Sequence, residues 1–138
     1  MTDEFLEFFT AGVIGLLGWF FGGLDGFVRV LIAFTVIDYI SGLCAAIVQK
    51  ERLSSAVGFK GIAKKVVIFS LVGIAHVIDR HILGDTAALR TAVCLFYVGN
   101  EGISILENAD KMKVPIPRYL KEKLLHFTEN ESKDATKK

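Results

Sequence analysis

The longest hydrophobic stretch of the chain covers residues 27–48 and carries an aspartate, Asp38, in its middle. As a helix rising about 1.5 Å per residue, these 22 residues span roughly 33 Å, slightly more than the ~30 Å hydrocarbon core of a bilayer. An ionised carboxylate at that depth costs about 2.5–3.5 kcal/mol even on lenient insertion scales. We therefore expect Asp38 to meet a partner, a proton or water inside the membrane.

The composition favours a membrane protein over a soluble domain. Of the 138 residues, 52% are hydrophobic, and the net charge is only +1. The charged residues lie mainly in loops and a tail, so no basic face predicts nucleic-acid binding. The N-terminus lacks the basic start and the cleavage site of a signal peptide. The cysteines, Cys44 and Cys94, lack the spacing of a disulfide framework or a metal site. We expect one membrane domain with no cofactor and no metal.

Four hydrophobic segments predict an all-α integral membrane protein with three or four spanning helices, at residues of about 8–24, 27–48, 63–83 and 87–106. The first segment contains five glycines and either crosses the bilayer or lies shallow at its surface. The third reaches spanning length only if flanking basic side chains extend their charges toward the headgroups. Residues 1–110 then form the membrane domain.

Basic residues predict the orientation, because Lys and Arg accumulate in cytoplasmic loops. The connection at residues 50–65 is the most basic one, so we place it and the C-terminus in the cytoplasm, whichever side the N-terminus takes. Its lysines are expected to contact the inner leaflet: Lys60, Lys64 and Lys65. Residues 111–138 form the cytoplasmic part, in which Pro115 and Pro117 precede a short, basic amphipathic helix at residues 118–127. We expect this helix to lie on the inner leaflet or on a neighbouring subunit, and a charged, disordered tail to begin at Glu129.

Small residues gather on one face of the first segment. They recur at helical spacing: Ala11, Gly15, Gly18 and Gly22. Such a face lets two helix backbones approach closely, and this packing is a main source of helix association in lipid. The spacing predicts a helix-packing contact, either within one chain or between chains.

The second and fourth segments carry polar stripes that reach similar depths. We predict that these residues line a pore or form helix interfaces: Asp38, Ser41, Gly42, Arg90, Asn100, Glu101, Ser104 and Glu107. No Lys or Arg is expected at the depth of Asp38 and Glu101 to neutralise them. A plainer interpretation is that the acids only hydrogen-bond neighbouring helices and hold the bundle in register.

The sequence shows no catalytic constellation. Its three histidines are scattered, and no nucleophile and base can be paired. We expect no enzymatic activity.

Four strings in the same order resemble the phage holin family of the toxin-secretion/phage-lysis type. They lie at residues 37–42 (IDYISG), 53–65 (LSSAVGFKGIAKK), 100–108 (NEGISILEN) and 114–117 (VPIP), and the likeness covers roughly residues 5–125. The resemblance implies a multi-pass protein of the bacterial cytoplasmic membrane that accumulates and then forms large lesions. Through these lesions an endolysin, or in toxin loci a toxin, reaches the cell wall without required direct contact. Holins in general are triggered by membrane depolarisation.

The implied function requires a homo-oligomer. A folded cargo of ~300 residues is roughly 50 Å across, so a ring of helices around it needs on the order of ten or more copies. Two alternatives stay open. One is a small oligomeric ion or proton channel, or a transporter component, with Asp38 and Glu101 along a narrow path. The other is a membrane-embedded assembly factor without a pore.

Overall fold

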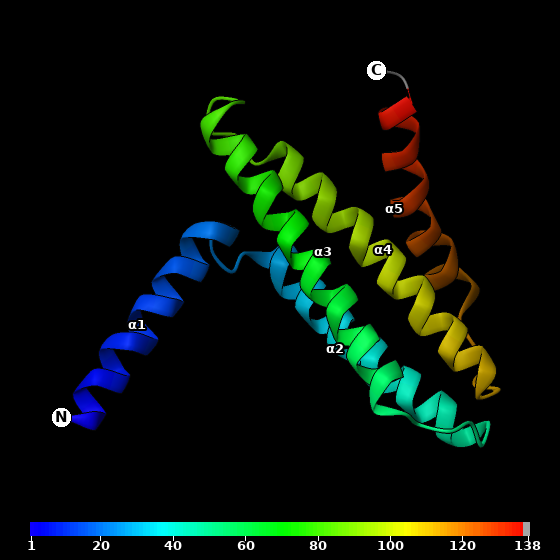
Figure 1. Cartoon of the computed structure of the whole chain (residues 1–138). Helices are drawn as coiled ribbons and strands as arrows, with labels where there is room; N and C mark the ends of the chain where they lie inside the picture. The colour runs from blue at the N-terminus through cyan, green and yellow to red at the C-terminus, as the bar shows by residue number, and fades with distance from the viewer. Residues whose placement is uncertain (137–138) are drawn as a thin grey trace.

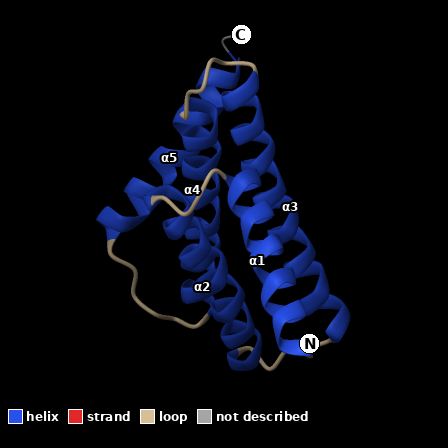
Figure 2. Cartoon of the chain, turned by 90° about the vertical axis from the view of Figure 1, so that its left-hand side faces the viewer, coloured by secondary structure: helices blue, strands red, loops and turns tan. Residues whose placement is uncertain are grey.

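The computed structural model describes the backbone of residues 1–136 and the side chains of residues 1–129. This part of the chain folds into five helices and no strand, which confirms the predicted all-α class (Figure 2). The helices are α1 (Thr2–Phe21), α2 (Gly26–Val48), α3 (Ser55–His81), α4 (Ala88–Lys111) and α5 (Arg118–Thr136).

Three of the helices, α1, α2 and α3, are long and apolar enough to cross a membrane. The fourth predicted span corresponds to α4, whose 24 residues are long enough but include Arg90, Glu101 and Glu107. These charges keep α4 out of the set of candidate spans in the described part of the chain.

Local capping sets where α2 and α3 begin. The Asp25 carboxylate accepts a hydrogen bond from the Val28 N–H at 3.0 Å, and Ser54 Oγ accepts one from the Val57 N–H at 3.2 Å. Each satisfies a donor that a helix start otherwise leaves unpaired. Because of the Ser54 cap, α3 starts at Ser55 rather than near residue 63, and a stretch expected to be a polar loop is helical.

The bundle is built around α4, which packs against α2, α3 and α5 (Figure 1). Its buried core consists of apolar side chains from three helices: Val28 and Leu31 of α2, Ile68 and Val72 of α3, Cys94 and Val98 of α4. Many large hydrophobic side chains of α1, α2 and α3 remain exposed, as a lipid-facing surface requires.

The first helix packs on α3 near its C-terminal end. Phe20 fills the space above Gly73, where an added Cβ would lie 2.0 Å from Phe20 Cε1. No residue of α1 is buried, and Gly12, Gly15 and Gly18 have open space around them. Most of α1 is therefore uncovered in the single chain.

The last helix folds back along α4 (Figure 1). Leu124 is buried and lies over Gly102, where an added Cβ would come within 2.7 Å of Leu124 Cδ2. In the single chain, α5 therefore packs on α4 of the same chain. The tail expected to be disordered from Glu129 is helical through Thr136, because Glu, Lys and Ala favour helix and extending a formed helix costs little. The end of that predicted tail, residues 137–138, lies outside the described residues.

Candidate functional site

Three charged side chains from three helices meet in the middle of the bundle. The Lys65 ammonium on α3 donates hydrogen bonds to Asp38 Oδ2 on α2 and to Glu101 Oε2 on α4. The side chains of Lys65, Asp38 and Glu101 are only 18%, 13% and 6% exposed. We call this group the Lys65 cluster.

Equal distances from the helix ends bring the three residues to one level. Asp38 lies ten residues before the end of α2, Lys65 ten after the start of α3, and Glu101 ten before the end of α4. Ten residues of helix span about 15 Å. Since α3 runs antiparallel to its two neighbours, all three side chains lie about 15 Å from the end that carries the α2–α3 connection.

The prediction that no basic residue lies at this depth is wrong. Lys65 was assigned to a polar connection at the inner leaflet, but α3 begins at Ser55 and carries Lys65 into the bundle. Because no other basic side chain contacts Asp38 or Glu101 among the described residues, Lys65 is their shared counter-charge.

Asn108 extends the cluster toward the same end. Its Nδ2 donates to Ser41 Oγ at 3.0 Å and lies 3.3 Å from both the Asp38 carbonyl and Asp38 Oδ1. An added Cβ at Gly42 would lie 3.6 Å from the same amide nitrogen. Sequence reasoning missed Asn108, although its place seven residues after Glu101 puts it on the same helix face.

The Lys65 cluster holds one more acid than base. With all three groups ionised it carries one net negative charge, and with one carboxyl protonated it is neutral. Buried ion pairs stabilise a fold only when their desolvation is offset by good geometry, and removing one partner leaves an uncompensated charge. Removal of any one of the three charges therefore changes the charge balance of the whole cluster.

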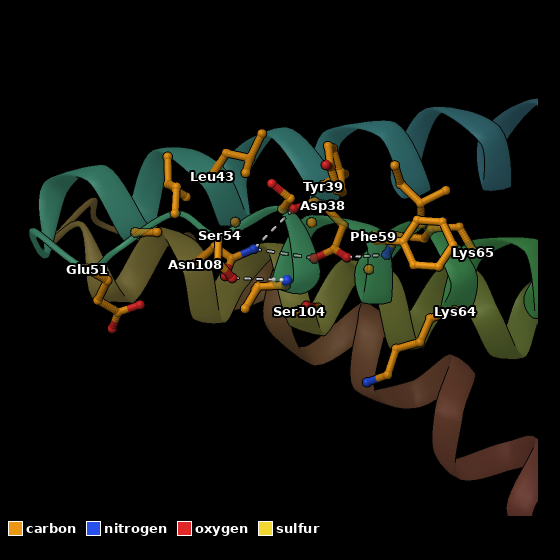
Figure 3. Close-up of a pocket in the computed structure, with 18 of the residues that line it drawn as sticks. Asp38, Tyr39, Leu43, Glu51, Ser54, Phe59, Lys64, Lys65, Ser104 and Asn108 are labelled. Carbon is orange, nitrogen blue, oxygen red and sulfur yellow. Dashed lines mark hydrogen bonds and ion pairs between the residues drawn. The ribbon is translucent and has the colours of Figure 1, made fainter.

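Two cavities flank Lys65. The first, of about 770 Å³, lies between α2 and α3 beside the end of α4, and reaches from Asp38 to Ser54 and Glu51 near the α2–α3 connection (Figure 3). The second, of about 720 Å³, lies between α3 and α4. Four residues line both cavities: Asp38, Lys64, Lys65 and Ser104.

The other predicted site residues fall around these cavities. Asn100, Glu107 and Lys60 line the α3–α4 cavity. Lys64 lines both cavities and lies beside the Lys65 cluster. In the described part of the chain, no group of three or more His, Cys, Asp or Glu could hold a metal ion.

Arg90 belongs to a second polar cluster, which joins α4 to the α1–α2 connection. Its Nε donates to the Phe21 carbonyl at 2.7 Å, its Nη2 donates to the Gly23 carbonyl at 2.8 Å, and its Nη1 pairs with Asp25. The Arg90 side chain is 3% exposed. Eleven residues, or about 16 Å of helix, separate it from Glu101, so the two do not act at one level.

Asp79 completes this Arg90 cluster. Its fully buried carboxylate accepts from the backbone N–H of Arg90 at 2.7 Å, from Leu89 N–H at 3.1 Å and from Thr86 Oγ1 at 3.1 Å. Asp79 therefore satisfies the first donors of α4 from the end of α3. Sequence reasoning missed Asp79 because its partners follow a turn whose geometry the sequence does not specify.

Asp25 lies outside the candidate spans and has a perturbed carboxyl. Partial burial acts to raise its pKa, but hydrogen bonds from the Val28 N–H and the Arg90 guanidinium, with the Arg90 charge, hold the pKa below its ordinary value. Sequence reasoning missed Asp25 too, although an Asp directly before a hydrophobic helix is a known N-cap signal.

The glycines of the predicted packing face of α1 have different surroundings in the structure. A Cβ added at Gly15 or Gly18 would meet no side chain or other helix within 4 Å, so the single chain does not use this face for close helix packing. Gly22 lies beyond the helix end as a left-handed cap with φ of 74°, against the His76 ring. A side chain there would be strained and would clash with His76.

Comparison with known proteins adds a family match. The model of the bacteriophage holin family matches residues 15–129. An uncharacterized protein of Listeria monocytogenes is 48% identical over 135 residues, which cover 98% of this chain and 95% of the relative. A protein of Bacillus phage phi105, named "probable holin", is 33% identical over 112 residues, 81% of each chain. No solved structure matches the chain significantly.

Proposed function

Because the chain belongs to the bacteriophage holin family, we propose that it gathers into large homo-oligomers in the bacterial cytoplasmic membrane and opens lesions there. An endolysin, or a toxin in toxin loci, then passes through the lesions to the cell wall. The protein acts without enzymatic chemistry and needs no direct contact with its cargo. The observation that carries the proposal is the Lys65 cluster inside a bundle whose outside is apolar.

The Lys65 cluster supports two alternative states of the bundle. In the single chain its charges are paired and turned away from the apolar exterior, which suits a protein that accumulates without harm. In a ring of many copies the same charged faces of α2, α3 and α4 would meet water. Exposing them to lipid costs several kcal/mol, so water or a neighbouring copy is the expected partner.

The uncovered face of α1 is the proposed contact between copies. The space beside the Cα atoms of Gly15 and Gly18 is open and would let a helix of another copy approach closely. A lesion wide enough for a folded protein needs on the order of ten or more such copies.

For the topology, we propose that α4 crosses the membrane together with α2 and α3, because it lies alongside both. The Arg90 cluster would then lie at the outer surface. The basic end near the α2–α3 connection would lie in the cytoplasm with the C-terminus, and Lys60 would reach the inner headgroups.

A narrow ion or proton channel is the second candidate. It is favoured by the two cavities, which bring open space of about 770 and 720 Å³ to the acids of the Lys65 cluster. Such a channel would pass ions in its smallest assembly and would never pass a folded protein.

The size of the released solute separates the candidates. Purified protein is reconstituted at rising density in liposomes that hold a small dye and a folded fluorescent protein of about 30 kDa, and a potential is applied and then dissipated. We expect both solutes to escape together above a threshold density. A Gly15→Leu/Gly18→Leu variant, matched in insertion, should need a higher density. Escape of ions alone would favour the channel, and retention of everything at high density would end the lesion proposal.

A further inference from the structure

We propose that α2, α3 and α4 form a half-channel, which brings water and protons to the Lys65 cluster from only one side of the membrane. The open side is the one that carries the α2–α3 connection. This inference requires that the bundle lies in a membrane, as proposed above, but it does not require lesions. It concerns the single chain before assembly.

The entrance lies at the α2–α3 connection. The α2–α3 cavity is lined there by Glu51, Ser54 and Ser55, which precede or begin α3, and by Lys111 at the end of α4. From these residues the cavity continues to Asp38, about 15 Å deeper along the helices. The path therefore has polar groups at its mouth and at its end.

The lining mixes apolar side chains, such as Leu43, Phe59 and Val67, with polar groups, and these polar groups favour water over lipid. The α3–α4 cavity adds Lys60, Glu107 and Asn100 to the polar groups around the cluster. Acyl chains cannot satisfy such groups, and each ionised side chain facing hydrocarbon costs several kcal/mol. Both cavities are also far larger than the ≈30 Å³ that one liquid water occupies. Water is thus the occupant that satisfies the polar groups of the lining.

The path ends at the apolar core that separates the Lys65 cluster from the Arg90 cluster. Between the Lys65 cluster and the Arg90 cluster lie Leu31, Val72 and Cys94, each with no exposed surface. Thirteen residues separate Asp25 from Asp38, about 20 Å of helix. A third cavity, of about 430 Å³, lies against α1 at this level, but its lining, which includes Val28, Ile32 and Phe69, is apolar. An apolar region offers water no partners and stays dry. The Arg90 cluster then closes the far end through its hydrogen bonds to the α1–α2 connection.

One-sided access determines which compartment supplies protons to the cluster. The charged groups around its acids come from every lining element: Glu51 in the connection, Asp38 on α2, Lys60, Lys64 and Lys65 on α3, and Glu101, Glu107 and Lys111 on α4. Helix α5 contributes none of the described residues that line the two cavities. One proton from the open side converts the cluster from one net negative charge to neutrality. The paired state of the bundle therefore responds to that compartment alone.

Cysteine accessibility tests this directly. The protein is reconstituted at low density in liposomes, with a trapped dye to verify that no lesion forms. A membrane-impermeant thiol reagent is added to either side. Each variant contains one cysteine, and every other native cysteine is replaced. The single cysteine is Ser104→Cys in the cavity lining, the native Cys94 in the core, or Val66→Cys on the exposed face of α3 next to Lys65. Glu51→Cys and Asp85→Cys report the two membrane sides.

We expect Ser104→Cys to react at least tenfold faster from the side labelled by Glu51→Cys than from the side labelled by Asp85→Cys. Cys94 and Val66→Cys should stay unmodified from both sides. Thermal unfolding in detergent identifies any variant that fails to fold. Reaction of Ser104→Cys from neither side, from both sides, or from the Asp85 side would overturn the half-channel. A liposome in which lesions never form at any density would contradict the proposed function and leave this result standing.

Discussion

Asp38 and Glu101 lie on different helices, yet they accept hydrogen bonds from one and the same ammonium group, that of Lys65. The Lys65 ammonium therefore links α3 to both α2 and α4. Loss of Lys65 leaves two carboxylates without a counter-charge, whereas loss of one acid leaves a neutral pair.

Replacing Lys65 with Met should strongly destabilise the bundle. Two carboxylates would remain close together without a counter-charge, at a cost of about 3–5 kcal/mol. Unfolding of the detergent-solubilised protein by a denaturing detergent measures the loss. The triple variant K65M/D38N/E101Q should recover most of the stability, because it removes the unpaired charges as well. Equal stability of K65M and the natural protein would mean that the three groups are not paired.

Neutralising Asp38 should delay membrane failure. In Asp38→Asn, Lys65 and Glu101 form a neutral pair, so the paired state loses its excess negative charge and becomes harder to open. Onset of lysis in a culture with controlled expression, with the amount of inserted protein matched, measures the delay. The control is Glu107→Gln, which changes a cavity-lining acid outside the cluster. Unchanged timing in Asp38→Asn would leave Asp38 with a packing role only.

Arg90 should hold α1 to the bundle. Arg90→Leu loses the two carbonyl contacts and the Asp25 pair, so the end of α1 should move more freely. Trp19, the chain's only tryptophan, lies beside that end and reports the change as a lower fluorescence anisotropy. Arg29→Leu, at an exposed position of α2, is the matched control and should leave the anisotropy unchanged. An Arg90→Leu variant with natural anisotropy would show that α1 is held by other contacts.

The same reporter should respond to acid through Asp25. Its pKa is lower in the folded protein than in the unfolded chain, where an Asp has about 3.9. The Arg90–Asp25 contact therefore stabilises the fold fully at pH values above the pKa that Asp25 has in the unfolded chain. This stabilisation is lost as the pH falls through the lower pKa that Asp25 has in the folded protein. Trp19 anisotropy should thus be constant above about pH 5 and fall below about pH 4. In Asp25→Asn this acid transition should disappear, and its persistence would assign it to another group.

A leucine at Gly99 should displace α5 from α4. An added Cβ at this position would lie 3.0 Å from the Leu124 carbonyl and 2.9 Å from Thr128 Cγ2, so a larger side chain does not fit. Trypsin should then cut faster at Lys121 and Lys123. Gly12→Leu, in open space on α1, controls for the added leucine. Natural cleavage rates in Gly99→Leu would mean that α5 is not docked on this face.

Local patterns in the sequence determine the fold class and the positions of several helices. The apolar runs and the helical spacing of Asp38 and Glu101 depend only on neighbours along the chain, so the all-α class, the positions of α2 and α4 and the equal depth of the two acids were predictable. The family match has the same origin, since the family model matches the sequence itself, over residues 15–129. Asn108 followed the same spacing and could have been recognised.

Only the tertiary structure decided which residue neutralises the acids and where α5 lies. Lys65 faces Asp38 and Glu101 because α3 starts at Ser55, ten residues earlier, and runs antiparallel to its neighbours. Arg90 meets Asp25 across 65 positions, and α5 finds its place through two glycines on α4. Such contacts depend on how whole helices pack, and a charge or a glycine looks the same in the sequence whether its face meets lipid, water or another helix.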